Sequence, residues 1–226
     1  MKILFLLLIC ITFQGYSMEN IDWDFIEDRE GNITTANVPD PEGSESGVTI
    51  ASGFDLGARS VSDLKGLSPA LVETLTPYLG LKKQEALQKL KEKPLKISAD
   101  EALSINKFAK AQSYNLLANS WKEATGKEFS SLPKHKATII TSVAFQYGNL
   151  KKRTPNFWKQ VTKDSWDQAY KNLLNFGDNY SSRRKEEAKY FKKGEEKYYK
   201  SILKNQKRTS LSETQVNDIL GKMNGR

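Results

Sequence analysis

The feature that most restricts the fold is a glycine-punctuated run, residues 46–57, with the sequence SGVTIASGFDLG. Within it, residues 48–54 alternate β-branched or aromatic side chains with small ones, a pattern that predicts a strand in a small hairpin sheet. Its glycines indicate that the backbone closely approaches another strand or a ligand. The stretch before it, residues 32–46, contains two prolines and is typical of turns.

After residue 60 the sequence predicts helices almost throughout. Ser68 followed by Pro69 marks a helix start, and so does the capping box formed by Ser98 and Glu101. Apolar residues over a wide arc make residues 132–147 the best candidate for the core. The predicted helices cover residues 21–29 (ending at Gly31), 69–79, 98–121 (with Leu116 near its apolar face), 132–147, a segment from Pro155, 166–174, a charged segment from Ser181 or Ser182 to about Gly194, and a last one opened by Ser210 and Glu213.

This pattern predicts an α+β fold with two lobes. Residues 18–60 form a small acidic lobe with a β-hairpin, and residues 61–200 form a larger helical lobe. Residues 201–226 form a basic helix that packs on this domain or extends it. A cleft between the lobes is the expected ligand site. The four tryptophans stand beside other apolar residues at helical spacing, so we expect them in the core rather than stacked on a ligand (Trp23, Trp121, Trp158 and Trp166).

The first seventeen residues predict a secretory signal peptide. Lys2 precedes an apolar run of about eleven residues, too short to span a bilayer, and small residues precede a cleavage site after Ser17. We therefore expect a periplasmic or secreted protein without a stable membrane anchor after cleavage. An uncleaved signal anchor is the alternative. Lipidation of Cys10 is not expected, because no small residue stands directly before it.

Cleavage would also remove the only cysteine of the chain, Cys10, and His135 is the only histidine. The exported chain would then lack disulfides and thiol catalysis. One histidine also excludes multi-histidine metal sites and argues against histidine-based triads. We expect no metal and no cofactor. His135 lies between two lysines, and we expect it to be exposed and inert.

The charge is distributed unevenly along the chain. Residues 18–60 carry ten acidic and two basic residues, whereas residues 61–226 carry 17 acidic and 32 basic residues. The excess of basic residues in residues 61–226 favours binding to an anionic partner such as a cell wall, an acidic membrane surface or nucleic acid. Export argues against nucleic acid, so we expect no such partner.

Three polar residues near the glycine-punctuated run could carry chemistry. Glu30 closes a predicted helix, where the helix dipole and burial would raise the pKa of a general acid. Asp55 follows a predicted strand end and could activate water, and the hydroxyl of Thr49 could hold that water. Glu27 is the competing acid. Each residue also has a plain structural interpretation: a solvated acid, a turn-forming aspartate and a strand-forming threonine.

The order and spacing of these residues resemble the lysozyme domain of the bacteriocin pesticin and its relatives, which are related to phage-type lysozymes. The resemblance rests on Glu30-Gly31, on Asn37-Val38-Pro39 and most specifically on residues 46–57. The second half adds further likenesses to phage lysozymes, and the resemblance covers residues 21–194. These likenesses are SVAFQYG at residues 142–148, TPNF at 154–157, WDQA at 166–169, and Arg183-Arg184 followed by Phe191 and Gly194.

The resemblance implies a lysozyme-like fold and muramidase activity, the hydrolysis of the β-1,4 bond between N-acetylmuramic acid and N-acetylglucosamine. By position, Glu30 would be the acid, Asp55 the base and Thr49 the residue that aids the attacking water. In phage lysozymes the aspartate precedes the threonine, so Asp40 remains an alternative base. Gln146 and Tyr147 match residues at the interlobe cleft and could contact substrate; a helix cap and a core residue are the alternatives.

We therefore predict an exported, bacteriolytic glycoside hydrolase that acts on peptidoglycan as a monomer, without metal or cofactor. A proteinaceous inhibitor or immunity protein is a further expected partner. The alternatives are a catalytically decayed peptidoglycan-binding or inhibitor-type protein on the same fold, and an antibacterial toxin with the same chemistry.

Overall fold

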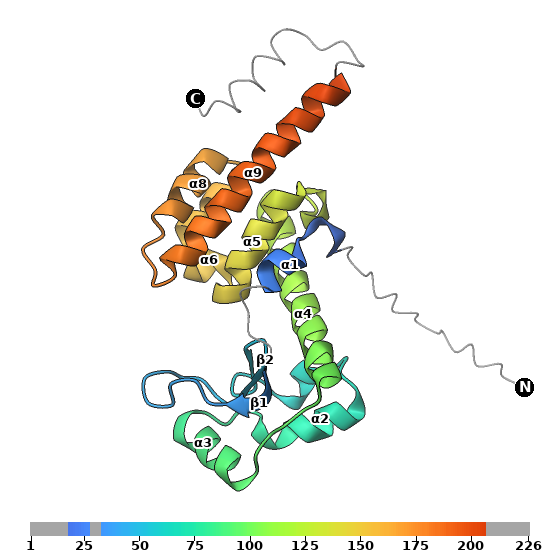
Figure 1. The fold of residues 1–226 in the computed structure, drawn as a ribbon, viewed down its shortest axis with the longest axis vertical. Helices are drawn as coiled ribbons and strands as arrows, with labels where there is room; N and C mark the ends of the chain where they lie inside the picture. The colour runs from blue at the N-terminus through green and yellow to red at the C-terminus, as the bar shows by residue number, and fades with distance from the viewer. Residues whose placement is uncertain (1–17, 28–32, 207–226) are drawn as a thin grey trace, which may run out of the picture.

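The computed structural model describes residues 18–27 and 33–206. The predicted signal peptide, Glu30, and the capping box of Ser210 and Glu213 lie outside the described residues. Figure 1 shows a part with the sheet at one end, a helical part at the other, and a long helix running between them. The elements are η1 (Met18–Asn20), α1 (Trp23–Glu27), β1 (Ile33–Asn37), β2 (Thr49–Ala51), β3 (Phe54–Asp55), η2 (Val61–Leu64), α2 (Pro69–Leu75), η3 (Thr76–Tyr78), α3 (Lys83–Glu92), α4 (Ala99–Thr125), η4 (Phe129–Ser131), α5 (Lys134–Tyr147), α6 (Leu150–Arg153), α7 (Pro155–Thr162), α8 (Trp166–Leu174) and α9 (Ser181–Gln206).

The sheet has three antiparallel strands in the order β1-β2-β3. Two expectations about it were wrong. The single strand predicted over residues 48–54 is divided by a turn at Ser52 and Gly53, where Gly53 has a φ of 81° that glycine adopts readily. The stretch predicted as turns opens with β1, because the β-branched residues from Ile33 onward pair with β2. The α+β fold class itself is confirmed.

The glycines at the two ends of the glycine-punctuated run pack backbone against backbone. A Cβ atom at Gly47 would lie 2.4 Å from the Cα of Gly57 and 2.4 Å from the carbonyl oxygen of Leu81. Both neighbours are main-chain atoms, which cannot rotate away as the end of a flexible side chain can. At these two positions, the close approach predicted from the sequence is therefore an approach of protein backbone.

Most predicted helices are present with the caps that the sequence indicates. The Ser98 side chain accepts a hydrogen bond from the Glu101 backbone N–H, and the Glu101 carboxylate accepts one from the Ser98 backbone N–H. This box opens α4, which ends at Gly126 with a φ of 70°. Helix α5 ends at Gly148, and Pro69 and Pro155 open α2 and α7.

Helix α9 differs from its prediction because it continues through Gly194 to Gln206. Gly194 does not cap the helix there. Instead, it leaves room for His135 of α5, whose Cβ would lie 2.2 Å from a Cβ added at Gly194. The prediction that His135 is exposed was also wrong: it is 6% exposed, and its Nε2 lies 2.5 Å from the Glu195 carboxylate.

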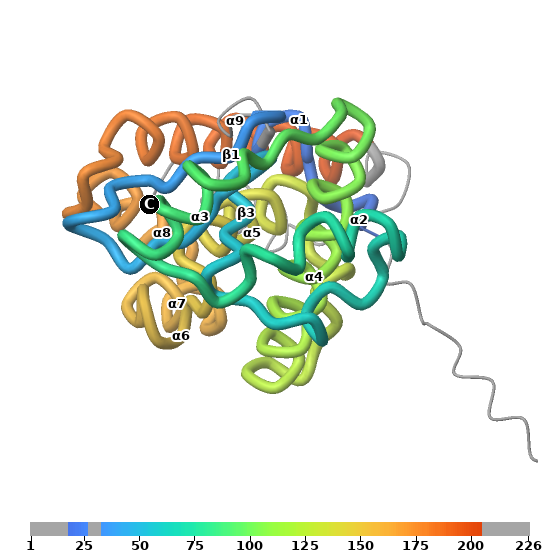
Figure 2. Tube along the Cα trace, turned by 90° about the horizontal axis from the view of Figure 1, so that it is seen from below, coloured from blue at the N-terminus to red at the C-terminus, as the bar shows by residue number. Residues whose placement is uncertain are grey.

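The described residues form two hydrophobic cores. The larger one lies among α4, α5, α7, α8 and α9, and it contains Trp121, Trp158 and Trp166, with Trp23 packed against it. The second core extends from Val38 to Ile105. The helices α2 and α3 therefore pack with the sheet, whereas the sequence assigned them to the helical lobe. In Figure 2, seen from the sheet end, this part lies in front of the other helices.

Helix α4 belongs to both cores. Its first half contributes Ala102 and Ile105 to the core under the sheet, and its second half contributes Tyr114 and Trp121 to the larger core. Leu116, predicted near the apolar face of this helix, is 71% exposed. Among the described residues, no helix is long and apolar enough to cross a membrane.

Candidate active site

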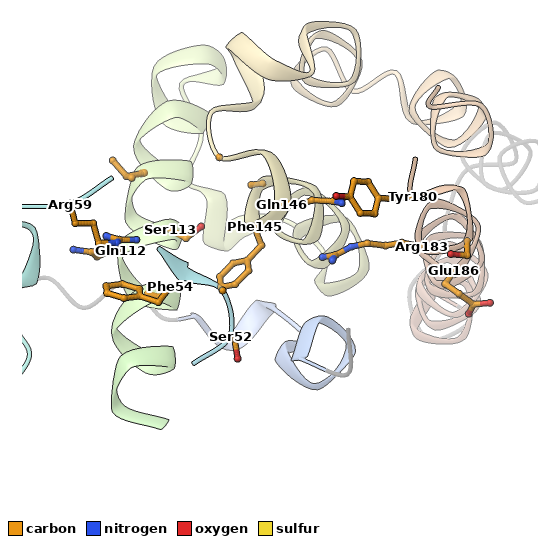
Figure 3. Close-up of a pocket in the computed structure, with 16 residues that line it drawn as sticks. Ser52, Phe54, Arg59, Gln112, Ser113, Phe145, Gln146, Tyr180, Arg183 and Glu186 are labelled. Atoms are coloured by element: carbon orange, nitrogen blue, oxygen red, sulfur yellow. Dashed lines mark hydrogen bonds between the residues drawn. The ribbon is translucent and has the colours of Figure 1, made fainter. Parts of the chain in front are cut away.

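A cleft of about 820 Å³ lies where the sheet, α4, the end of α5 and the start of α9 meet. Figure 3 shows Arg59, Gln112 and Phe54 near one end of this cleft and Arg183 and Glu186 near the other, with Phe145 between them. The cleft is bounded by elements from both cores, as predicted for a ligand site in a two-lobe fold. Its lining residues are Ser52, Gly53, Phe54, Arg59, Ala109, Gln112, Ser113, Leu116, Ala144, Phe145, Gln146, Gly148, Tyr180, Ser182, Arg183 and Glu186.

Asp55 ends β3, directly after the cleft-lining residues 52–54. Its Oδ1 accepts hydrogen bonds from the backbone N–H groups of Gly57 (2.7 Å) and Gly47 (3.1 Å). The close packing of the two glycines therefore provides two aligned donors that fix the orientation of the carboxylate. Its second oxygen, Oδ2, has no hydrogen-bond partner among the described residues.

Thr49 lies opposite Asp55 in the sheet, because the two residues are partners in the β2–β3 register. The Thr49 side chain is buried, and its hydroxyl donates a hydrogen bond to the Gly47 carbonyl oxygen (3.3 Å). Neither Thr49 nor Asp55 itself lines the cleft described above. The structure nevertheless pairs these two predicted residues at the edge of the cleft, next to its lining residues 52–54.

Asp40, the alternative base, occupies a different environment. It is an exposed residue in the loop between β1 and β2, with a φ of 43°. Its Oδ1 accepts a hydrogen bond from the Gly43 backbone N–H (2.9 Å). These features are those of a residue that closes a turn.

Glu30, the predicted acid, lies outside the described residues, but the elements on both sides of it are described. Ile26 in α1 is buried in the larger core. Ile33 in β1 pairs with Ala51 of the sheet. The described residues before and after Glu30 therefore belong to different parts of the fold: Ile26 to the larger core, and Ile33 to the sheet.

The two predicted substrate-binding residues at the end of α5 differ in their surroundings. Gln146 lines the cleft, and its Oε1 accepts a hydrogen bond from Arg184. The Tyr147 hydroxyl donates a hydrogen bond to Asp178 Oδ2 (2.6 Å). Burial and this bond raise the pKa of Tyr147. Burial alone would raise the pKa of Asp178, but the hydrogen bonds from Tyr147 and Arg184 outweigh it and lower that pKa.

Comparison with protein families shows what this arrangement is similar to. The chain matches the model of the Pesticin family, described as the bacterial toxin homologue of phage lysozyme (C-terminal part), over residues 20–167. The chain belongs to the Pesticin family. Comparison with the curated proteins gives no match.

Membership of the Pesticin family confirms the resemblance seen in the sequence and suggests a lysozyme-like protein, a peptidoglycan hydrolase or toxin. The matched region contains all five candidate residues: Glu30, Thr49, Asp55, Gln146 and Tyr147. In the described part of the chain, no group of three or more histidine, cysteine, aspartate or glutamate residues is placed to hold a metal ion.

Sequence reasoning missed several polar residues of the cleft in this Pesticin-family chain. Arg59, Gln112 and Glu186 line the cleft, and none of them belongs to a motif in the sequence. Arg59 follows Asp55 by four residues, and that proximity is the one signal that could have drawn attention to it. Gln112 lies midway along α4 and gives no such signal.

Proposed function

We propose that this protein is an exported peptidoglycan hydrolase that cleaves the β-1,4 bond between N-acetylmuramic acid and N-acetylglucosamine. The observation that carries the proposal is the pairing of Thr49 and Asp55 on neighbouring strands at the edge of the cleft, within the region that matches the Pesticin family. In this proposal Glu30 protonates the leaving oxygen and Asp55 activates water. Thr49 aids in holding that water.

The described geometry of Asp55 suits the activation of water. Two backbone donors hold Oδ1, while Oδ2 has no partner among the described residues and remains available to accept a proton from water. An inverting glycosidase uses one carboxylic acid and one carboxylate on opposite sides of the bond, separated by the space of a water molecule. Gln146 would contact the glycan in the cleft, and Tyr147 would support it through Asp178 and Arg184.

The direct test is the mature protein incubated with purified peptidoglycan, followed by mass analysis of the released muropeptides. The proposal expects fragments with reducing N-acetylmuramic acid ends, each heavier by one water than an anhydro product. Anhydro-muramic ends would instead indicate a lytic transglycosylase, which needs no water-activating base. Binding to peptidoglycan without any product would indicate a decayed, binding-only protein.

We expect Asp55→Asn to lower kcat on peptidoglycan by about 10²–10³-fold, because an amide cannot take a proton from water. The asparagine Oδ1 can still accept the bonds from Gly47 and Gly57, so the fold is retained. Asp40→Asn is the matched control and is expected to stay within about 3-fold of wild type, since Asp40 closes an exposed turn. The reverse order of the two effects, measured as initial rates of reducing-end release, would assign the base to Asp40.

An antibacterial toxin with the same chemistry is the second candidate, and the family description as a toxin homologue favours it. A toxin that threatens its own producer requires an inhibitor or immunity protein. Expressing the chain with and without its predicted signal peptide in a bacterium tests whether it is toxic from the side of the cell wall. Lysis only when the enzyme reaches the periplasm would support export to the wall and the toxic potential together.

We expect the rate of hydrolysis of intact walls to fall about tenfold between low salt and about 0.5 M salt. Added salt screens the attraction between exposed charges, because the Debye length decreases from about 10 Å at 0.1 M to about 3 Å at 1 M. The reason is adsorption of the basic body, residues 61–226, to an anionic surface. Short soluble glycan fragments are the control, because their hydrolysis does not depend on adsorption. Equal salt dependence on walls and fragments would contradict the adsorption role.

A further inference from the structure

All seven lysines of α9 lie on one face of this helix, and all of them are exposed. At 3.6 residues per turn they fall within an arc of about 140°, and at 1.5 Å per residue they extend along about 29 Å of helix. Figure 1 shows the C-terminal end of α9 extending beyond the other helices. We call this surface the lysine face of α9; it consists of Lys185, Lys189, Lys192, Lys193, Lys197, Lys200 and Lys204.

The lysine face has no paired counter-charge in the described part of the chain. None of its lysines forms an ion pair or a hydrogen bond with another described residue. The nearby carboxylate of Glu195 is turned inward, where it lies 2.5 Å from His135 Nε2 and 3.3 Å from Lys136 Nζ on α5. Between residues 188 and 206, the exposed side of α9 carries one carboxylate, Glu196. This face is therefore strongly basic.

Such an arrangement is unfavourable for the helix alone. Lys189, Lys193 and Lys197 follow one another at a spacing of four residues, and like charges at this spacing destabilise a helix. The opposite side of α9 offsets this cost, because Ala188 and Phe191 are buried in the larger core. An anion bound along the lysine face would relieve the repulsion.

A cavity of about 520 Å³ adjoins the lysine face and shares no lining residue with the cleft. Lys193 and Lys197 line it from α9, and Lys134 lines it from the start of α5. Its lining carboxylate, Asp22, already accepts a hydrogen bond from the Tyr190 hydroxyl (2.9 Å). Three lysines from two helices therefore border one concavity, and lysine ammonium groups are compact charges that bind phosphate.

The shape of this surface favours one kind of anionic partner. A bilayer is flat and cannot enter the cavity, and the buried side of α9 between residues 188 and 191 is not free to insert among lipids. Export argues against nucleic acid. A flexible chain of phosphate groups can follow the lysine face and place one phosphate in the cavity.

We propose that the lysine face of α9 and the adjoining cavity bind a wall polymer of repeating phosphate groups and hold the enzyme beside its glycan substrate. The choice of a wall polymer rests on the proposed function, because it requires export to the wall. The binding site itself is separate from the cleft and needs no hydrolysis.

The test measures binding alone, by fluorescence anisotropy of labelled, soluble poly(glycerol phosphate) titrated with the mature chain at low salt. The face variant combines Lys189→Gln, Lys193→Gln, Lys197→Gln and Lys200→Gln. The control variant has the same net charge and changes four exposed lysines that line neither the cleft nor this cavity: Lys151→Gln, Lys152→Gln, Lys159→Gln and Lys163→Gln. Thermal unfolding verifies that both variants fold. Vesicles of phosphatidylglycerol and phosphatidylcholine are tested in parallel.

We expect the Kd of the face variant for the polymer to rise about 10-fold over wild type, as the sum of four weak, exposed charge pairs. The control variant should stay within about 3-fold of wild type. Equal weakening in both variants would reduce the effect to net charge and overturn the inference. Binding of wild type to the vesicles but not to the soluble polymer would also overturn it and assign the face to a membrane. Failure of wild type to release any product from peptidoglycan would reject the proposed function and leave the binding result unchanged.

Discussion

Glu30→Gln is expected to lower kcat on peptidoglycan by about 10³-fold, the largest effect of any single change in the site. The amide has almost the same size as the carboxylic acid but has no proton to give to the leaving glycosidic oxygen. Substrate binding does not depend on that proton, so KM should change far less than kcat. The measurement is the initial rate of reducing-end release from purified peptidoglycan at several substrate concentrations.

Glu27→Gln is the matched control, because Glu27 precedes Glu30 by three residues and was the competing acid in the sequence. It is expected to keep activity within about 3-fold of wild type. Both variants should unfold at the temperature of wild type, since each replaces a carboxylate by an isosteric amide. A severe loss in Glu27→Gln together with an active Glu30→Gln would move the acid to Glu27.

Local signals account for the parts of the fold that could be predicted. A proline at the first helical position, a serine–glutamate capping box and a glycine at a helix end each act within one turn of chain, and the starts of α2, α4 and α7 follow from them. The strand β1 was missed because its β-branched residues gain their role only through pairing with β2. Gly194 misled the prediction because its partner, His135, is 59 residues away.

The candidate site likewise contains some residues that local sequence could identify and others that it could not. Thr49 and Asp55 could be named together from the sequence because both lie in the glycine-punctuated run, but the turn at Ser52 and Gly53 that pairs them across two strands was not predicted. The hydrogen bond between Arg59 and Gln112 joins residues 53 positions apart, and that between Tyr147 and Asp178 joins residues 31 apart. No local pattern marks such pairs. They follow only from the way α4, α5 and α9 pack around the cleft.

Arg184→Met is expected to lower the free energy of unfolding by about 3–5 kcal/mol, the cost of leaving one member of a buried ion pair without its partner. Arg184 is 1% exposed and Glu187 is fully buried. Arg184 joins the α8–α9 loop, helix α9 and the end of α5 through Asp178, Glu187 and Gln146. The loss would be a large part of the 5–15 kcal/mol that stabilises a typical domain, and urea unfolding followed by circular dichroism measures it.

Two further variants separate a buried unpaired charge from a simple loss of packing. Arg153→Met removes an exposed arginine and is expected to cost less than about 0.5 kcal/mol. Glu187→Gln combined with Arg184→Met removes the charge left behind on Glu187, and the double variant should regain part of the stability lost in Arg184→Met. Hydrogen bonds from Ser142 and Arg183 to Glu187 Oε1 remain in Arg184→Met and reduce the loss of stability. If Arg184→Met proved as stable as Arg153→Met, those two bonds would suffice to hold the Glu187 charge, and Arg184 would serve chiefly to orient Gln146 in the cleft.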